Sequence, residues 1–231
     1  MEFDVITVFP EMILAPLERT ILRRAIDGGL MTVRAHQLRD FAPGKHRRVD
    51  DEPYGGGYGM VMKPEPIFSA VETIQARHPS ASSRTVLLSP QGDRFDHDRA
   101  IRYSLYERLI LICGRYEGVD ERVRQCLVDE DISIGDYILT GGELAALVII
   151  DAVARLVPGV VGEGASVLGD TFAEGMLKHP QYTRPASFRN RKVPDVLLSG
   201  RHREIGEWRR RTALENTRKK RPDLLDPRGA K

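Results

Sequence analysis

The sequence predicts an α/β fold in which a mostly parallel sheet is flanked by helices, followed by a small, mainly helical C-terminal domain. Segments expected to be strands alternate with segments expected to be helices, which is typical of parallel sheets. Three apolar segments run directly into turns marked by glycine or proline: Thr85–Gly92, Leu109–Gly118 and Ile132–Glu143. Ligands of open α/β sheets bind outside the carboxyl ends of strands, where glycine lets backbone approach closely. These turns therefore predict one ligand pocket, and the pocket suggests an enzyme that acts with a small molecule.

The first elements follow from the spacing of apolar residues. Glu2–Phe9 alternates and is rich in β-forming residues, so it predicts a first strand, and Leu30–His36 predicts a second. Between them, Pro10–Ile26 carries apolar residues at helical spacing and stops before two glycines, which predicts one helix. Phe41–Met62 has no periodicity and predicts a long loop, and loops of this length are usually functional or disordered.

The middle of the chain continues the alternation. Gly142–Val157 predicts a mostly apolar helix that Pro158 and Gly159 end. The other expected elements here are helices over Pro64–Arg77, Asp98–Glu107 and Val119–Val128, and strands over Arg84–Leu88, Arg108–Cys113 and Ile132–Ile134.

A stretch with four glycines and little periodicity follows the apolar helix, which is typical of a flexible linker. We therefore expect a ligand-binding domain over residues 1–160, a linker over 161–169 and a second domain over 170–231. Ile205–Thr217 is the clearest helix of the second domain.

The net charge of +2 hides an uneven distribution along the chain. From residue 170 onward there are 16 Lys and Arg against 8 Asp and Glu, a net charge of +8, whereas the preceding part carries 19 against 25, a net charge of −6. A solvated charged surface does not require such segregation. A basic second domain therefore favours a polyanionic partner such as nucleic acid.

Composition and targeting signals favour the reducing cytoplasm. The hydrophobic content of 41% and the charged content of 29% are ordinary for a soluble globular protein. The first ten residues carry acids where a secretory signal needs a basic region, and the apolar run Leu144–Val157 is too short to span a bilayer. Cys113 lies in an apolar run and predicts a small buried side chain, without metal-ligand spacing to Cys126. We expect a cytoplasmic protein without a membrane partner.

Several chemistries are disfavoured by absent motifs. The glycines at positions 55–59 are not followed by the lysine of a phosphate-binding loop, which disfavours nucleotide hydrolysis, and no Gly-x-Gly-x-x-Gly follows the first strand. The absence of a Gly-x-Ser-x-Gly elbow disfavours a serine hydrolase. A histidine metal site is not expected either, because the six histidines have no paired spacing: His36, His46, His78, His97, His179 and His202.

Polar residues beyond the strand ends are candidates for ligand contact. Tyr116 can stack on a base, and Glu117 can accept a hydrogen bond from an amine or a ribose hydroxyl. A turn into a capped helix explains Asp120 and Glu121, because acids suit the positive N-terminal end of a helix. That structural interpretation does not explain Tyr116 and Glu117.

Two more residues have both a structural and a chemical interpretation. Arg155 lies one turn before the end of the apolar helix, where its charge complements the carbonyl end of the helix dipole. Asp170 begins the segment Asp170–Gly175, where aspartate is favoured as a helix N-cap. From position alone, the structural role is favoured for both.

Nine short motifs are more specific in their order and spacing than any one of them is alone. They are Phe9–Met12, Val49–Gly57, Leu88–Gly92, Cys113–Gly118, Ser133–Tyr137, Gly141–Leu144, Phe172–Gly175, His179–Pro185 and Val196–Gly200. Together they resemble the bacterial tRNA (guanine-37-N1)-methyltransferases, and the resemblance covers nearly the whole chain. Tyr58 and Ala145 depart from the family pattern, because proline is expected at both positions.

The resemblance implies a SPOUT-type fold, in which a deep trefoil knot is built into the mostly parallel sheet. It implies that the knotted loops bind S-adenosylmethionine and that the enzyme is an obligate homodimer with active sites shared across the interface. The apolar helix is a candidate contributor to that interface. The residues implied to bind the cofactor are Leu88, Ser89, Pro90, Gln91, Gly114, Arg115, Tyr116, Glu117, Ser133, Ile134, Gly135, Asp136, Tyr137, Ile138, Leu139, Gly141 and Gly142.

The resemblance also assigns a catalytic pair. The aspartate that precedes the family's Phe-Ala-Glu-Gly motif by two positions is Asp170, and the arginine before the Pro-Gly at the end of the apolar helix is Arg155. Asp170 would remove the N1 proton of guanine, and Arg155 would stabilise negative charge on O6. The family is linked to Mg²⁺, for which Glu117 is the candidate ligand.

The implied partner is the anticodon stem-loop of tRNA, and no DNA partner is expected. The implied reaction transfers a methyl group from S-adenosylmethionine to N1 of guanosine 37, next to the anticodon. Two alternatives are a SPOUT enzyme that methylates another RNA position and a non-catalytic RNA-binding protein of the same fold. The residues expected to bind RNA are His46, Asp50, Gly59, Arg184, Arg209, Arg210 and Arg211.

Overall fold

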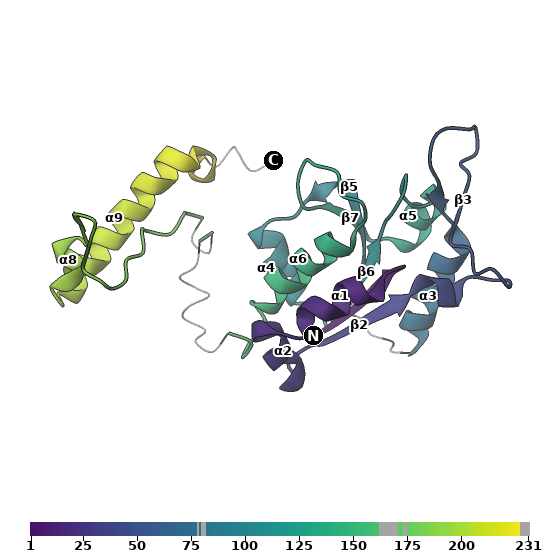
Figure 1. The fold of residues 1–231 in the computed structure, drawn as a ribbon, viewed down its shortest axis with the longest axis horizontal. Coiled ribbons are helices and arrows are strands. Elements are labelled where there is room, and N and C mark those ends of the chain that lie inside the picture. The colour runs from purple at the N-terminus through teal and green to yellow at the C-terminus, as the bar shows by residue number, and fades with distance from the viewer. Residues whose placement is uncertain (78, 80–81, 162–170, 173–174, 227–231) are drawn as a thin grey trace. The chain divides into compact units, whose positions relative to one another are not determined.

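A computed structural model describes residues 1–77, 79, 82–161, 171–172 and 175–226 (Figure 1). The chain divides into two compact units, Met1–Gly162 and Glu163–Lys231. Each unit is described by itself below. Asp170, one of the two predicted catalytic residues, lies outside the described residues.

The first unit is built on a five-stranded sheet with the order β2-β1-β6-β5-β7. Every neighbouring pair of strands in it is parallel. The prediction of an α/β fold with a mostly parallel sheet is confirmed. The strands are β1 (Glu2–Thr7), β2 (Thr32–Gln37), β5 (Ser83–Arg94), β6 (Arg108–Cys113) and β7 (Glu130–Ser133).

Helices cover both faces of this sheet, and β6 contributes to the apolar core on each side. Leu109, Leu111 and Cys113 pack into one core, whereas Ile110 and Ile112 pack into the other. The helices on the first side are α1 (Pro10–Leu17), α2 (Thr20–Asp27), α4 (His97–Ser104) and α6 (Glu143–Ala154). The second side carries α3 (Pro64–Arg77) and α5 (Glu121–Leu127) (Figure 1). The short η1 (Leu38–Phe41) packs on the same core.

The single helix predicted over Pro10–Ile26 is wrong, because the segment forms two helices. Pro16 has no amide hydrogen to continue the helical hydrogen bonds, and α1 ends one residue after it. Thr20 then adopts a φ of 71°, which a continuous right-handed helix cannot contain. The chain therefore turns between α1 and α2 and packs both helices on the same core.

One predicted strand and one predicted loop also differ from the structure. The strand predicted over Arg84–Leu88 continues as β5 to Arg94, because a bulge between Leu88 and Asp93 lets pairing with β7 resume. The loop predicted over Phe41–Met62 contains a short antiparallel pair, β3 (Asp50–Asp51) and β4 (Val61–Met62). These two strands close the glycine-rich segment between them into a loop.

The second unit contains a short hairpin and three helical segments among its described residues. The predicted helix Ile205–Thr217 lies within a longer helix, and Trp208 on that helix contacts the rings of His179 and Tyr182. The elements are β8 (Ser187–Phe188), β9 (Arg191–Lys192), α8 (Asp195–Leu198), α9 (His202–Lys220) and η2 (Pro222–Leu225).

A charged cluster at the start of β1 predicts a pH dependence of stability. Arg34 and then Arg108 donate hydrogen bonds to the Glu2 carboxylate, at 3.2 Å and 3.0 Å, and lower its pKa from 4.5 to about 2. This contribution to stability is present above about pH 4.5 and is lost as the pH falls toward about 2, because the unfolded chain binds the proton first. Urea denaturation between pH 5 and pH 2 should show a shallower loss of stability for Glu2→Gln than for the parent. Glu18→Gln, at an exposed carboxylate outside the cluster, should keep the parent's slope.

Candidate active site

A pocket of about 620 Å³ lies beside the bulge of β5 and at the carboxyl ends of β6 and β7. Because the three strands are parallel neighbours, the bulged segment of β5 and the loops that follow β6 and β7 meet at one edge of the sheet. Every residue predicted to bind the cofactor lines this pocket except Asp136, which is exposed and does not line it. The structure thus brings together the three glycine-bearing turns from which the sequence predicted one pocket.

Two of the pocket loops are joined backbone to backbone. The amide of Gly142 donates a hydrogen bond to the Gly114 carbonyl at 2.9 Å, and Arg115 and Gly141 form an isolated antiparallel bridge. A Cβ atom on Gly142 would lie 2.8 Å from Cys113 Cα and 3.1 Å from the Gly114 nitrogen. Glycine is required at position 142 because these backbones approach too closely for a side chain.

We predict that Gly142→Ala separates these loops. The added methyl group meets backbone that cannot move aside, so we expect a loss of about 1–3 kcal/mol in the free energy of unfolding. The matched control is Gly206→Ala in α9, where a Cβ atom has nothing within 4 Å and should be neutral or stabilising. Thermal unfolding of the two variants measures the difference. Equal stability of the two variants would contradict the close approach.

The pocket loops contain backbone conformations with positive φ, which residues other than glycine rarely adopt. Tyr116 has a φ of 59°, and Gly118 and Gly135 have φ values of 114° and 152°. The Ser133 side chain holds the last of these turns, because its hydroxyl contacts both the carbonyl and the amide of Gly135, at 3.0 Å and 3.2 Å. A non-glycine residue in the left-handed region costs energy, and residues strained in this way cluster at functional sites.

A buried ion pair lies behind these loops. The Nε atom of Arg115 donates to Glu143 Oε1 at 3.1 Å, and the Thr7 hydroxyl donates to the same oxygen at 2.7 Å. Glu143 is 1% exposed, so its charge depends on these donors. The Arg115 guanidinium also lies over the Phe9 ring, 4.4 Å from its centroid. The network links β1, the 114–118 loop and the first turn of α6.

Cys113, at the end of β6, is buried as predicted, at 1% exposed. Burial raises the pKa of its thiol well above the usual range, which keeps the side chain neutral. The other cysteine, Cys126, is exposed.

One rim of the pocket is tied to the glycine-rich loop. The Glu117 amide donates to the Met60 carbonyl at 3.0 Å, and the Met62 amide donates to the Gly118 carbonyl at 2.9 Å. Gly59 lies so close that a Cβ atom there would be 2.6 Å from Glu117 Oε1. Asp120 then caps α5 by accepting from the Arg122 amide at 3.0 Å, which confirms the structural role expected for it.

Arg155 is the C-cap residue of α6, and its side chain is exposed. This position agrees with the structural interpretation given to Arg155 from the sequence. Because Asp170 lies outside the described residues, the structure does not test whether the two predicted catalytic residues lie together.

The predicted RNA-binding residues fall in both units. His46 is exposed, Asp50 starts β3 and Gly59 lies at the end of the glycine-rich loop. In the second unit Arg184 and the consecutive Arg209, Arg210 and Arg211 of α9 are exposed, and Arg211 lies 3.9 Å from Glu215.

A family model described as tRNA (Guanine-1)-methyltransferase TrmD matches residues 1–227. The chain belongs to this family. The resemblance drawn from the nine motifs is therefore confirmed.

Curated relatives of this family agree with the match. A protein from Geobacter sulfurreducens named tRNA (guanine-N(1)-)-methyltransferase is 56% identical over 97% of this chain and 91% of its own length. Proteins of the same name from Dehalococcoides mccartyi and Geobacillus kaustophilus are 53% and 54% identical, each over 98% of this chain. They are covered over 91% and 92% of their own lengths.

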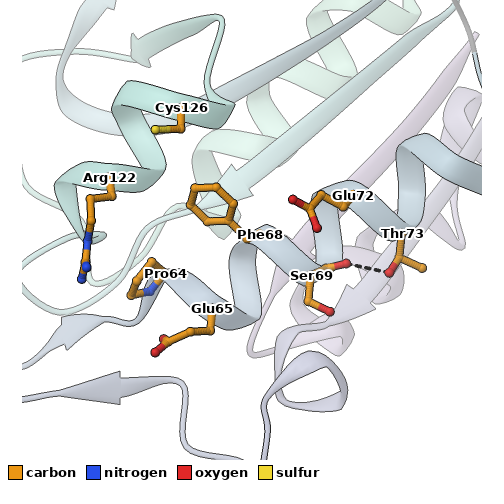
Figure 2. A pocket seen from close by; sticks show the side chains of 8 residues that line it. All are labelled: Pro64, Glu65, Phe68, Ser69, Glu72, Thr73, Arg122 and Cys126. Carbon is orange, nitrogen blue, oxygen red and sulfur yellow. Dashed lines mark hydrogen bonds between the residues drawn. The ribbon is translucent and has the colours of Figure 1, made fainter.

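A second pocket, of about 590 Å³, lies between α3 and α5 and contains none of the predicted site residues. Figure 2 shows that the Thr73 hydroxyl contacts the Ser69 carbonyl there, with a hydrogen bond of 2.6 Å. This bond lies within α3. The lining residues are Pro64, Glu65, Phe68, Ser69, Glu72, Thr73, Arg122 and Cys126.

Within the described part of the chain, no helix is long and apolar enough to cross a membrane. Among the same residues, no group of three or more His, Cys, Asp or Glu side chains is placed to hold a metal ion. Glu117, the predicted Mg²⁺ ligand, has its carboxylate beside Gly59.

Sequence reasoning missed Glu143 and Thr7 as residues of the site. Glu143 is part of one of the family motifs, but its partner Thr7 is 136 residues away in the chain. A carboxylate directly after two glycines, at the start of an otherwise apolar helix, is the signal that could have identified Glu143.

Proposed function

We propose that this chain transfers a methyl group from S-adenosylmethionine to N1 of guanosine 37 of tRNA, next to the anticodon. As a member of the tRNA (guanine-N1)-methyltransferase family it is a methyltransferase, and its acceptor is N1 of guanine in tRNA. The observation that carries the proposal is the pocket beside the β5 bulge and the ends of β6 and β7, lined by the segments that the family motifs contain. We also propose that the protein acts in the cytoplasm, where tRNA and the methyl donor are present.

The pocket residues fit the methyl donor. A volume of about 620 Å³ is within the range of small-molecule sites, and its walls combine apolar side chains such as Leu88 and Ile134 with exposed backbone at glycines. Backbone amides and carbonyls can bind an adenine ring by its edges, because each offers one donor or one acceptor. When bound, the donor supplies a reactive sulfonium methyl group.

The proposed roles of Asp170 and Arg155 follow from the chemistry of guanine. N1 carries a proton and is a poor nucleophile while it keeps that proton, so a carboxylate such as Asp170 must accept it. Negative charge then develops on O6, where the guanidinium of Arg155 stabilises it. Arg155 lies at the C-terminal end of α6. The pocket lies at the N-terminal end of the same helix, so the two are separated by its length. A second copy of the chain is therefore proposed to complete each site.

Exposed apolar residues support the proposed homodimer. Leu144 and Val148 lie one turn apart on α6 and are 51% and 47% exposed, and Leu14 on the neighbouring α1 is 43% exposed. Large apolar side chains gathered on touching helices favour a partner surface. The proposed trefoil knot is supported by the family and by the pairing between the 114–118 and 134–142 loops.

We place the donor-binding domain at residues 1–160, a linker at 161–169 and a basic, mainly helical tRNA-binding domain at 170–231. Arginine and lysine of that domain are proposed to contact phosphates of the anticodon stem-loop, which adds affinity without reading sequence. No step is assigned to Mg²⁺, since no group of candidate ligands lies together among the described residues.

Loss of the three consecutive arginines of α9, Arg209–Arg211, should flatten the salt dependence of tRNA binding. The combined Arg209→Ala, Arg210→Ala and Arg211→Ala variant removes three exposed cations. Each lost phosphate contact lowers the slope of log K against log salt by about 0.7–0.9. Filter binding at several salt concentrations measures this slope. Alanine at Arg19 and Arg23, which are exposed in the first unit, should leave it unchanged.

The proposed reaction is tested by locating the methyl group. Purified protein, labelled donor and unmodified tRNA transcripts with guanosine or adenosine at position 37 are incubated, and primer extension maps the product. A methyl group on N1 of guanosine 37, and its absence from the adenosine transcript, support the proposal. Modification at another position would favour a different RNA methyltransferase, and uptake of tRNA without methylation would favour a non-catalytic binding protein.

A further inference from the structure

We propose that Tyr54 and Tyr58 form a stacking surface for unpaired RNA bases beside the methylated guanosine. The inference rests on the proposed function. It adds how the first unit binds the tRNA loop that contains the methylated guanosine. The resemblance did not assign either tyrosine to a site, and Tyr58 stands where the family pattern leads us to expect proline.

The first observation is the exposure of the two rings. Tyr54 and Tyr58 have relative exposures of 101% and 97%, the largest among the exposed large hydrophobic residues of the described chain. Most tyrosine rings in folded proteins bury much of their surface, because the apolar ring gains from leaving water. Two neighbouring rings that contact almost nothing in their own chain are therefore available to a partner.

The second observation is the backbone that carries them. Gly55, Gly56 and Gly57 have φ values of 84°, 79° and 135°, and Gly59 has a φ of 80°. These values lie in a region that L-residues rarely adopt, so the glycines fix a turn that other residues would resist. The two tyrosines flank three glycines in the sequence, so no residue between them carries a side chain.

The third observation is the anchoring of the loop. Its stems pair as β3 and β4, with Asp50 opposite Met62 and Asp51 opposite Val61. On the far side, Met60 accepts a hydrogen bond from Glu117 of the donor pocket at 3.0 Å. The tyrosines thus project from a loop that is fastened to the rim of the pocket where the acceptor base must be presented.

The chemistry of the loop favours nucleic-acid bases as the occupant. Aromatic rings stack on bases of any identity, and RNA loops offer bases that can be turned out of their own stack. Lys45 and Arg48, on the incoming side of the loop, are exposed cations that suit the phosphates between such bases. The rival occupant, a second copy of this chain, is an outcome of the test.

The test compares leucine and phenylalanine at both positions in the full-length protein. Tyr54→Leu and Tyr58→Leu remove the aromatic face but keep an apolar side chain, whereas Tyr54→Phe and Tyr58→Phe keep the face and remove only the hydroxyl. Base stacking of the usual strength predicts that each leucine variant raises the KM for tRNA by about 5-fold to 100-fold. The phenylalanine variants should stay within about 2-fold of the parent.

A fluorescent base supplies a direct readout. We would place 2-aminopurine next to guanosine 37 in an anticodon stem-loop, where stacking on tyrosine changes its emission. The change should persist in the phenylalanine variants and disappear in at least one leucine variant. Calorimetry should show unchanged affinity for S-adenosylmethionine in all four, because neither tyrosine lines the donor pocket.

Three results would overturn the stacking surface. Leucine variants with the parent's KM would show that the rings do not bind RNA. Phenylalanine variants as impaired as leucine variants would assign the effect to the hydroxyl group. A fall in oligomer mass by light scattering in the leucine variants would assign the surface to a second copy. If the parent itself does not methylate tRNA, the proposed function fails instead, so the two failures are distinct.

Discussion

Replacing Asp170 by asparagine is expected to lower the rate of methyl transfer by about 10²-fold to 10⁴-fold, the usual contribution of a general base. Asparagine has nearly the same shape but cannot accept the N1 proton of guanine at neutral pH. Since the residue is proposed to act on the acceptor, the fold and the affinity for the donor should be almost unchanged. Single-turnover methylation of a tRNA transcript, with donor binding by calorimetry, measures both quantities.

The control for this variant removes a carboxylate of the same unit. Asp195→Asn changes an exposed residue at the start of α8 and should retain the parent's rate. Near-normal turnover of Asp170→Asn would remove this residue from the role of base. An equal loss of donor affinity and rate would instead indicate a role in building the pocket.

Replacing Glu143 by alanine should destabilise the first unit by about 3–5 kcal/mol. The change leaves the Arg115 guanidinium, whose side chain is 15% exposed, without the carboxylate at 3.1 Å. It also removes the acceptor of the Thr7 hydroxyl. An uncompensated buried charge costs more free energy than the intact ion pair contributes. Removing Glu143 alone should therefore be more destabilising than removing both partners of the pair. Urea denaturation at pH 7 measures the loss.

Two further variants make this prediction specific. The double change Arg115→Met and Glu143→Leu removes both charges and should recover much of the lost stability. Glu121→Ala removes an exposed carboxylate that lies 3.6 Å from Arg124, and it should cost less than about 1 kcal/mol. If Glu143→Ala loses no more than Glu121→Ala, the buried pair does not hold the pocket loops together.

Elements with strong local signals were predictable from the sequence. α3 and β6 occupy the predicted ranges, Pro64–Arg77 and Arg108–Cys113. In α3 two prolines stand in the first turn and a regular apolar face follows, while β6 is apolar throughout and ends at a glycine. The glycine-bearing turns likewise indicated where strands end, which is why the pocket could be anticipated.

Features that depend on tertiary contact were not predictable in this way. Pro90 and Gly92 indicated the end of a strand, but pairing with β7 extends that strand through a bulge. The Thr7–Glu143 hydrogen bond joins residues 136 positions apart, so no local pattern contains it. Asp136 belongs to a pocket motif, but the turn directs it away from the cavity.

Backbone hydrogen bonds join Met60–Met62 to Glu117–Asp120 in a ladder. They connect the glycine-rich loop, proposed to bind tRNA, to the rim of the pocket proposed to bind the methyl donor. Ordering either side of a shared ladder lowers the entropic cost of ordering the other. Any gain in tRNA affinity that the methyl donor produces must be matched by an equal gain in donor affinity produced by tRNA, because such linkage is reciprocal. The amide of Glu117, which donates across this ladder, is the place where deuterium exchange should slow when either ligand binds.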